Sequence, residues 1–454
     1  MTDIQTPALS LVPALTAPRK PRALRSTELT LDSGLRVLAV RKPGVPLVEL
    51  RLRIPFLSGR AGHAARAALL SDVMLTGTAG AAGFDRAGLA AAVQALGGDL
   101  NVGVDADRLV VSANVLAANL PALLAILSEV LVAASYPADE FETERGRLLE
   151  NLAIARARSG VIANEALSKL LFGDHPYARE LPQPGEVAAV RAAQLRKLHA
   201  ETVLPGGAVL VLVGDVTPSR VLDQVATALA GWQGQRSAGR PLKIPAVIPA
   251  PLLLVDRPGS VQSSLRMGGT AARRDDPRYP ALQLANTIFG GYFSSRWTEN
   301  IREDKGYTYG PHSRIEHNSL GSVLVLDADV ATEVTAPALL ETLYELGRIA
   351  SLPVTEQELE SVRQYAIGTL ALSTATQSGL ASTLAGLLGV GLQPDWLAEH
   401  TARLAAVRIE DVNAAAAEFF APTRFASVVV GDADQVTGPL SAITALTLPA
   451  VPIA

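Results

Sequence analysis

The densest group of side chains suited to binding lies between Phe289 and Gly310, in FGGYFSSRWTENIREDKGYTYG. This stretch combines a glycine pair, adjacent serines, two arginines and a closing pair of tyrosines. Arginine carries several N–H donors, and a tyrosine hydroxyl both donates and accepts hydrogen bonds. Gly290 and Gly291 would let the backbone approach a ligand closely. Ser295 is expected to cap the following helix. The stretch is therefore the first candidate for a working surface.

A simpler interpretation of the same residues stays open. Arg302 fits a solvated helix position paired with Glu299 or Glu303, and Tyr309 fits an amphipathic strand. Composition alone favours this reading, because charged and aromatic residues are common at helix ends and strand edges.

Metal-ligating residues are sparse and badly spaced for a zinc site. The chain has no cysteine, which excludes disulfides and thiolate metal sites. None of the six histidines lies three or four residues from another, so no helical histidine pair is available. They are His63, His175, His199, His312, His317 and His400.

The bulk composition describes a globular chain of more than one domain. With 454 residues, the chain is too long for one ordinary core. A net charge of −4 without a long basic run disfavours nucleic-acid binding. No run of apolar residues is long enough to predict a membrane span. In residues 1–24 the basic patch follows the apolar part, which is the wrong order for a secretory signal, so we expect a flexible tail and a cytoplasmic protein.

Two halves of the sequence repeat each other. VLAVRKPG at 37–44 matches LLLVDRPG at 252–259, and VLVLVGDV at 209–216 matches ASVVVGDA at 426–433. The offset is about 215 residues at both ends, which indicates an internal duplication. Each half alternates runs of strands with runs of amphipathic helices, a pattern typical of an α+β fold.

We therefore predict two homologous α+β domains joined by a linker. Each is expected to be a mainly antiparallel sheet with helices packed on one face, and the gap between them is the natural place for a ligand. The predicted boundaries are a tail at 1–24, an N-terminal domain at 25–232, a linker at 233–250, a C-terminal domain at 251–434 and a tail at 435–454.

Seven segments resemble, in the same order, the pitrilysin/insulinase family of zinc metallopeptidases, which includes the mitochondrial processing peptidase subunits. The resemblance covers about residues 28–434. The segments are LTLDSGLRVLAV (29–40), LSDVMLTGTAG (70–80), LGGDLNVGVDAD (96–107), FETERGRLLENL (141–152), FGDHPY (172–177), LPGGAVLVLVGDV (204–216) and the stretch 289–310. The family is built of repeated α+β domains, in agreement with the duplication.

Active members of that family carry the zinc motif H-x-x-E-H on a helix. Aligned on the closing M-L-T-G-T, the motif positions here are Ala68, Ser71 and Asp72. The third ligand, a later glutamate, falls on Asn151, and a shift of one residue would give Glu150. The resemblance therefore implies a degenerate site without metal, in which Ser71 and Asp72 face a water-filled cleft.

Two histidines near these segments are not expected to replace the lost ligands. His63 lies one turn before the degenerate helix, but the partner ligands that a zinc site needs are missing. His175 belongs to the HPY segment and is interpreted as a structural loop residue.

By the same resemblance, the second half retains the family's substrate-contacting pair, although the first half lacks the zinc motif. Family members carry an Arg and a Tyr seven residues apart that contact substrate near the scissile bond, and Arg302 and Tyr309 match this pair. By resemblance, Arg302 would bind a peptide carbonyl and Tyr309 would stabilise a developing oxyanion.

The resemblance implies a non-catalytic, metal-free subunit of a heterodimeric zinc peptidase. The chain would close the chamber and supply Arg302 and Tyr309, while a homologous H-x-x-E-H partner would hold the zinc. We expect it to cleave nothing alone. The alternatives are a structural scaffold, like the core subunits of the respiratory bc1 complex, and a peptide-binding homodimer without peptidase activity.

Overall fold

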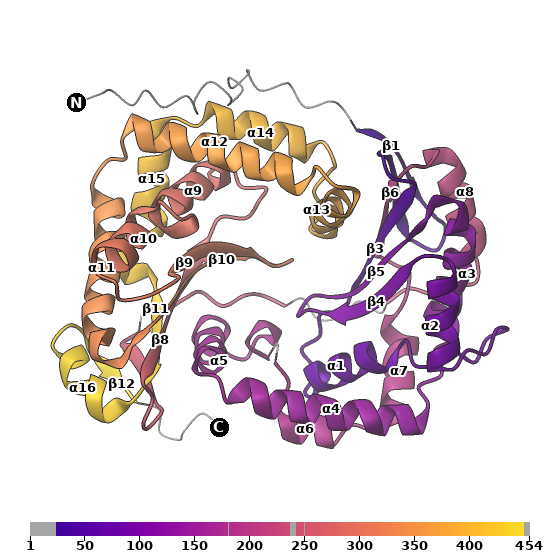
Figure 1. Ribbon diagram of the computed structural model, residues 1–454, viewed down its shortest axis with the longest axis horizontal. Coiled ribbons are helices and arrows are strands. Elements are labelled where there is room, and N and C mark those ends of the chain that lie inside the picture. Colours follow the sequence, from indigo (N-terminus) through magenta and orange to yellow (C-terminus); the bar gives the residue numbers. More distant parts are fainter. Residues whose placement is uncertain (1–23, 180, 237–241, 249, 449–454) are drawn as a thin grey trace, which may run out of the picture.

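Two six-stranded sheets organise the chain, one in each half (Figure 1). The computed structural model describes residues 24–179, 181–236, 242–248 and 250–448. The strand order is β1-β2-β6-β3-β5-β4 in the first sheet and β12-β7-β11-β8-β10-β9 in the second. Neighbouring strands are antiparallel except β2–β6, β7–β11 and β7–β12. The predicted α+β class with two similar, mainly antiparallel sheets is confirmed.

Within its described residues, the first half contains six strands and eight α-helices. The strands are β1 (Arg25–Thr30), β2 (Arg36–Arg41), β3 (Leu47–Pro55), β4 (Asp99–Val104), β5 (Arg108–Leu116) and β6 (Val209–Gly214). The helices are α1 (His63–Val73), α2 (Arg86–Ala95), α3 (Leu120–Ala133), α4 (Ala138–Arg156), α5 (Ser159–Phe172), α6 (Pro184–Ala188), α7 (Ala192–Thr202) and α8 (Pro218–Ala228).

The second half repeats this plan with its own strands and helices. The strands are β7 (Leu252–Asp256), β8 (Gln262–Ala271), β9 (His312–His317), β10 (Ser322–Ala331), β11 (Ala426–Gly431) and β12 (Leu446–Thr447). The helices are α9 (Tyr279–Asn286), α10 (Arg296–Thr298), α11 (Thr335–Ser351), α12 (Glu356–Ser373), α13 (Gln377–Gly389), α14 (Trp396–Ala406), α15 (Ile409–Phe419) and α16 (Ala433–Ser441).

Sequence pattern explains which sheet face each strand buries. In β3 the residues alternate, so Val48, Leu50 and Leu52 enter the first-half core while the intervening side chains face the other half. The central strands β6 and β11 are apolar along almost their whole length and are buried on both faces. A central strand of this kind needs a covering layer on each side of the sheet.

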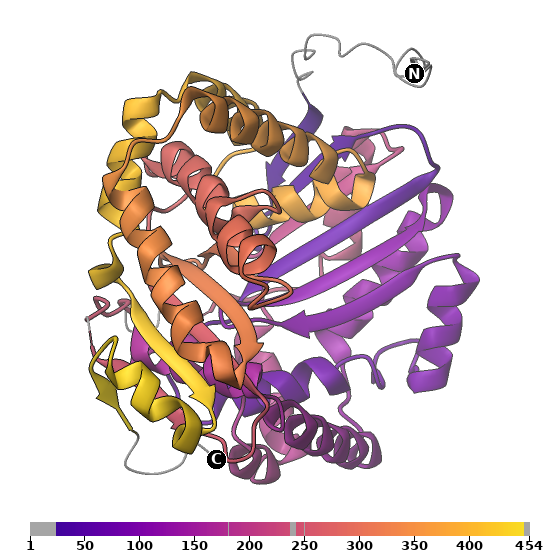
Figure 2. The same cartoon turned by 60° about the vertical axis from the view of Figure 1, so that its left-hand side comes forward.

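That second layer comes from the opposite half (Figures 1 and 2). Each half covers the outer face of its sheet with its own helices, but α5 lies on β8 and β11 of the second sheet, and α13 lies on β3 and β6 of the first. Leu167 and Leu171 pack with Val428 and Val430, and Leu384 packs with Val211. The halves therefore exchange one helix each.

An arginine on each sheet fixes the incoming helix. Arg51 of β3 donates from Nη2 to Ser378 Oγ at 2.8 Å and from Nε to Ser382 Oγ at 3.1 Å. In the second sheet, Arg266 of β8 donates from Nε to Asn164 Oδ1 of α5 at 3.0 Å. The two contacts occupy equivalent places in the duplicated halves.

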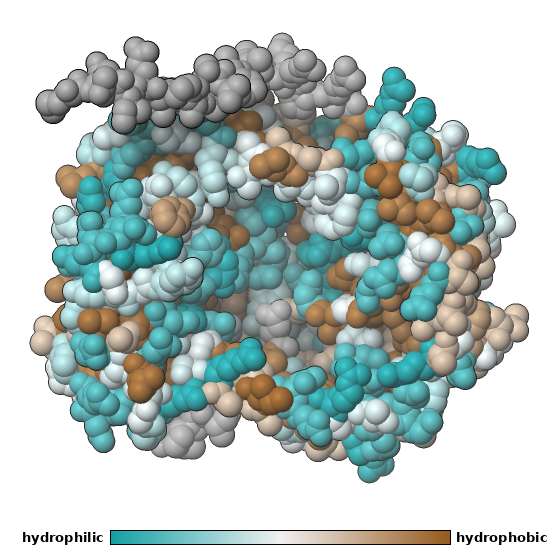
Figure 3. Space-filling view, viewed as in Figure 1, coloured by the Kyte–Doolittle hydropathy of each residue, from teal (hydrophilic) through white to brown (hydrophobic). Residues whose placement is uncertain are grey.

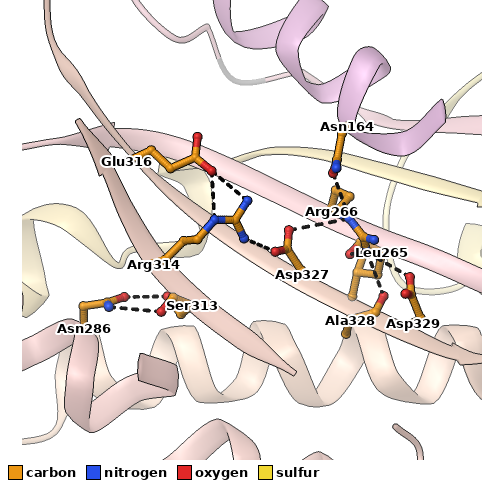
Figure 4. Close-up of polar contacts among 10 residues, drawn as sticks. All are labelled: Asn164, Leu265, Arg266, Asn286, Ser313, Arg314, Glu316, Asp327, Ala328 and Asp329. Atoms are coloured by element: carbon orange, nitrogen blue, oxygen red, sulfur yellow. Dashed lines mark hydrogen bonds and ion pairs between the residues drawn. The ribbon is translucent and has the colours of Figure 1, made fainter. Parts of the chain in front are cut away.

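The exchange leaves a recess between the halves, and its visible surface is mostly hydrophilic (Figure 3). On the second sheet an ion-pair network extends from Arg266 across β9 and β10 (Figure 4). Arg266 Nη1 contacts Asp329 Oδ1 at 3.0 Å, and Arg314 pairs with both Asp327 and Glu316. None of the helices in the described ranges combines the length and the apolar composition needed to cross a bilayer.

The segment boundaries differ in detail from those expected. The boundary at 434 falls inside α16, and β12 adds to the edge of the second sheet, so the C-terminal unit continues past that residue. Helix α5 lies in the N-terminal sequence half but packs on the second sheet. The joint lies between α8 and β7, and the tail at 1–23 lies outside the described residues.

We predict that the exchanged helices carry much of the stability. Leu384→Ala should lower the free energy of unfolding by about 2–5 kcal/mol, because Leu384 is fully buried between α13 and β6 and its truncation leaves a cavity. Urea denaturation followed by circular dichroism measures this. Leu372→Ala, at a position that is 76% exposed, is the matched control and should change stability by less than about 0.5 kcal/mol. Equal effects of the two substitutions would contradict the prediction.

Candidate functional site

The stretch 289–310 contains two π-helical segments. Helix α9 continues into η4 (Thr287–Gly291), and α10 continues into η5 (Glu299–Asp304). π-Helical turns are rare and occur frequently at functional sites, because the extra residue in the turn re-aims side chains. The stretch first identified by its residue types therefore also has unusual backbone geometry.

The two glycines serve internal packing. A Cβ on Gly290 would lie 2.9 Å from Trp297 and 3.0 Å from Ser313, and one on Gly291 would lie 3.1 Å from Asn286. The close approach predicted for a ligand is instead an approach of the chain to itself. Ser295 precedes α10, but its hydroxyl contacts Thr298 Oγ1 at 2.8 Å and makes no capping bond to the helix backbone.

A half-buried ion pair anchors α10. Arg296 binds Glu358 of α12 through Nε at 2.6 Å and Nη2 at 2.9 Å, a two-bond contact that fixes geometry as well as charge. Burial alone would raise the pKa of Glu358, but the hydrogen bonds from Arg296 and from Thr355 at the start of α12 lower it to about 2. The segment that presents Arg302 is thus tied to α12.

Arg302 and Tyr309 lie next to each other. The Arg302 guanidinium carbon is 4.5 Å from the centroid of the Phe293 ring and 5.1 Å from that of Tyr309, so the guanidinium contacts two aromatic rings. Tyr309 is 88% exposed, and Phe293 is 60% exposed. Thr308 holds the loop by donating to the Asp329 carbonyl at 2.7 Å. The residues form a projecting aromatic–cation cluster.

The simpler interpretation of Arg302 is also partly realised. Its Nε lies 3.3 Å from Glu303 Oε1, one of the two carboxylates considered from sequence. Aromatic contact and ion pairing are compatible, because a guanidinium uses its faces for rings and its edge for carboxylates. Phe293 was not singled out from the sequence, although it precedes the serine pair directly.

The degenerate zinc positions on α1 do not converge on one point. The Ser71 hydroxyl donates to the Ala68 carbonyl of its own helix at 2.8 Å. Ala68 lines a small pocket of about 70 Å³ together with His63, whereas Ser71 and Asp72 line a separate groove of about 420 Å³. His63 Nε2 is engaged by the Phe56 carbonyl at 2.9 Å.

The groove that contains Asp72 also contains a buried carboxylate that sequence alignment did not select. Glu144 of α4 is paired with Arg86 and with Arg147, whose Nη1 lies 2.9 Å from Glu144 Oε1. Asn151, the predicted third position, is exposed and does not line the groove. Glu144 lies seven residues earlier, two turns away on nearly the same helical face, so helical spacing could have suggested it.

These residues do not fit a zinc ion. The described residues contain no cluster of three histidine or carboxylate side chains that could hold a metal. Glu144 is already neutralised by two guanidiniums, both of which contact its Oε1, so its charge is not available to a cation. The groove is a charge-compensated polar surface.

Asp72 is the carboxylate of this groove whose pKa is shifted most clearly. Burial raises its pKa from 3.8 to about 6, and the charge of Glu144 adds to the increase. Asp72 is nevertheless exposed at the mouth of the groove, so screening by solvent makes the energetic consequence smaller than the pKa shift alone implies.

We predict a pH-dependent penalty from Asp72. In the unfolded chain Asp72 ionises near pH 4, but in the folded chain it retains its proton to about pH 6, so the folded state loses stability as pH rises across this window. Asp72→Asn should therefore match the wild type near pH 4 and exceed it by on the order of 1 kcal/mol at pH 7. Urea unfolding at several pH values tests this, with exposed Asp223→Asn as the control. A stability difference that does not change with pH would contradict the prediction.

Two family descriptions match the chain in sequence order. Residues 67–185 match the insulinase (peptidase family M16) model, and residues 189–365 match the model described as the peptidase M16 inactive domain. The chain is 26% identical over 415 residues to an uncharacterized zinc protease of Mycobacterium tuberculosis, covering 90% of this chain and 94% of that protein. It is 25% identical to one of Streptomyces coelicolor, covering 85% of each.

Solved structures with the same fold support the match. A peptidase M16 inactive domain from Pseudomonas fluorescens superposes with a TM-score of 0.82 at 26% identity, covering 90% of this chain and 98% of that one. A protease from Helicobacter pylori gives the same TM-score at 18% identity, covering 90% of this chain and all of that one, which shows a shared fold. The chain belongs to the pitrilysin/insulinase (M16) peptidase family, as a member that lacks the zinc motif.

Proposed function

We propose that this chain is the metal-free subunit of a two-chain zinc peptidase and contributes Arg302 and Tyr309 to substrate binding. The observation that carries the proposal is the asymmetry between the two candidate sites. Two of the three zinc-motif positions line a groove in which arginines neutralise Glu144, whereas Arg302 contacts Phe293 and an exposed Tyr309. A chain that had lost all function would have little reason to project this cluster.

The chemistry of the pair suits a peptide. The guanidinium can donate to a peptide carbonyl, and the Tyr309 hydroxyl can donate to an oxygen that gains negative charge during attack. Ring contacts from Phe293 and Tyr309 limit the motion of Arg302, which lowers the entropy lost when substrate is bound. A homologous partner with H-x-x-E-H would supply the zinc ion and the general base.

The groove beside α1 suits an extended chain. It is lined by the edge strand β4, which pairs with β5 on one side and has a free edge on the other. Edge strands can accept a peptide as an added strand. This feature also suits the alternative, a homodimer that binds peptides without cleaving them, and the first experiment below separates the two. We place the complex in the cytoplasm.

Peptidase activity should require both chains and both residues. Mixed with a family member that carries H-x-x-E-H, the wild-type chain should support cleavage of a quenched fluorescent peptide library. Arg302→Ala or Tyr309→Phe should lower kcat/KM by roughly 100-fold, the usual loss for one transition-state donor. Tyr344→Phe, at another exposed tyrosine, should have no effect. Full activity of both site variants would instead favour a scaffold role, and peptide binding without cleavage would favour the homodimer.

The purified chain should contain far less than one zinc ion per molecule after dialysis against zinc. The reason is that Ala68, Ser71 and Asp72 replace the three motif residues and Glu144 is ion-paired. Inductively coupled plasma mass spectrometry measures the metal, and the H-x-x-E-H partner serves as the positive control. Stoichiometric zinc, together with chelator-sensitive cleavage by the chain alone, would overturn the proposal.

A further inference from the structure

The duplication supplies an internal comparison for buried residues between the halves. In the sheet registers, Arg51 pairs with Ser112 and Val211, and Arg266 pairs with Asp327 and Val428 at the same places of the second sheet. Two residues further along each strand, Arg53 is equivalent to Gly268. On the neighbouring strand, Arg108 is equivalent to Val323.

In the second half this place is apolar. A Cβ on Gly268 would lie 2.7 Å from Leu171 of α5, so the glycine makes room for the leucine. Val323 is 4% exposed and belongs to the same apolar cluster. Sheet and helix therefore meet here through hydrocarbon alone.

In the first half the sheet carries the large residues, which are charged, and the helix carries the glycines. A Cβ on Gly386 of α13 would lie 3.3 Å from Arg53 Nη1, and one on Gly389 would lie 3.4 Å from Arg108 Nε. Two glycines of the helix thus accommodate two guanidiniums of the sheet. Arg108 is 8% exposed.

Each of these guanidiniums has one buried nitrogen without a hydrogen-bond partner among the residues that the structure describes. Within the described ranges neither Arg53 nor Arg108 donates a side-chain hydrogen bond, and Arg53 Nε and Arg108 Nη2 are buried. The paired carboxylates are distant: Asp105 Oδ2 is 3.8 Å from Arg53 Nη2, and Asp107 Oδ2 is 3.8 Å from Arg108 Nη2. Both separations exceed hydrogen-bond length.

Asp107 is committed to a different contact. Its Oδ1 accepts from the Tyr177 hydroxyl at 2.6 Å and from the Ser319 hydroxyl at 2.7 Å, and its Oδ2 accepts from the Ser319 N–H at 2.7 Å. The end of α13 does not replace it, because the Leu387 and Leu388 carbonyls accept backbone N–H groups from residues 390–392.

A third arginine approaches from the second half. Arg274 follows β8, and its Nε is also buried without a partner among the described residues. Burial, with the nearby charge of Arg108, lowers the pKa of Arg53 to about 10, although the charges of Asp105 and Asp107 oppose this shift; Arg274 adds a smaller decrease. Arg53 thus lies within electrostatic reach of two other arginines and of two carboxylates, and neither Arg53 nor Arg108 is at hydrogen-bond distance from its carboxylate.

Stability does not explain this arrangement, since the equivalent place in the second half shows that the same fold can be closed with apolar side chains. A buried guanidinium without partners costs free energy. From the unpaired N–H donors of Arg53 and Arg108 and their position beside Arg274, we infer that the junction of the two halves binds a small oxyanion, either free phosphate or a carboxylate group. Bound there, it would join residues of both halves and hold them together. This inference does not depend on the proposed peptidase role.

The test is a titration of the full-length chain with sodium phosphate, with ionic strength held constant by NaCl because exposed charges are screened by salt. Differential scanning calorimetry should show a saturable rise in Tm of about 2–4 °C by ~20 mM phosphate. Parallel titrations with acetate, and with a short peptide bearing a free or an amidated C-terminus, distinguish phosphate from a carboxylate group as the occupant.

The test variant replaces the arginine arrangement of the first half with the apolar arrangement of the second half. Arg53→Gly and Arg108→Val install the residues found at the equivalent sheet positions, and Gly389→Leu gives α13 a leucine to fill the space, as Leu171 of α5 does beside Gly268. The triple variant should therefore fold and should lose the anion response. Arg408→Gln removes an exposed arginine and should respond like the wild type. An equal Tm rise in the triple variant, or no response of the wild type to any of these anions, would overturn the inference.

Discussion

Helix α5 crosses from the first half to lie on β8 and β11, and α13 crosses back to lie on β3 and β6. Strands β6 and β11 are apolar on both faces, so separation of the halves would expose both to water. The exchange therefore makes the two sequence halves one folding unit in spite of their separate sheets. It also sets the width of the recess between them, because each sheet is spaced from the other half by one helix.

This constraint decides which side chains reach the recess. Apolar contact with α5 and α13 uses only part of each inner sheet face, and the rest is polar. On the second sheet the ion-pair network joins Arg266 and Arg314 through Asp327 of β10 (Figure 4). Thr308 donates a hydrogen bond to the Asp329 carbonyl of the same strand. The loop that carries Tyr309 is thus fastened to β10, while α10 is fastened to α12 through Arg296. Arg302 lies between these two anchors.

Local patterns predicted most elements but not the exchange. The alternation in β3 and the repeat of the Gly-Asp strand ends both depend on near neighbours, so they are readable from the sequence. Helices α5 and α13 have ordinary amphipathic sequences, and nothing local records which sheet they meet. Among the candidate residues, Arg302 and Tyr309 could be named from the resemblance of their segment to the family. Glu144 and Phe293 gain their roles only from packing between distant segments.

The duplicated halves also separate structural from functional reasons for a residue. Arg51 and Arg266 agree at equivalent positions, and each fixes the start of an incoming helix, so a structural reason is sufficient for both. Arg53 and Gly268 differ at equivalent positions, and the apolar version is the less costly one to bury. A difference of this kind needs a reason other than stability, because the second half of the same chain shows an arrangement that costs less free energy to bury. The groove beside α1 also contains compensated charges. There Arg86 and Arg147 neutralise Glu144 of α4, the helix on which the third zinc ligand was expected.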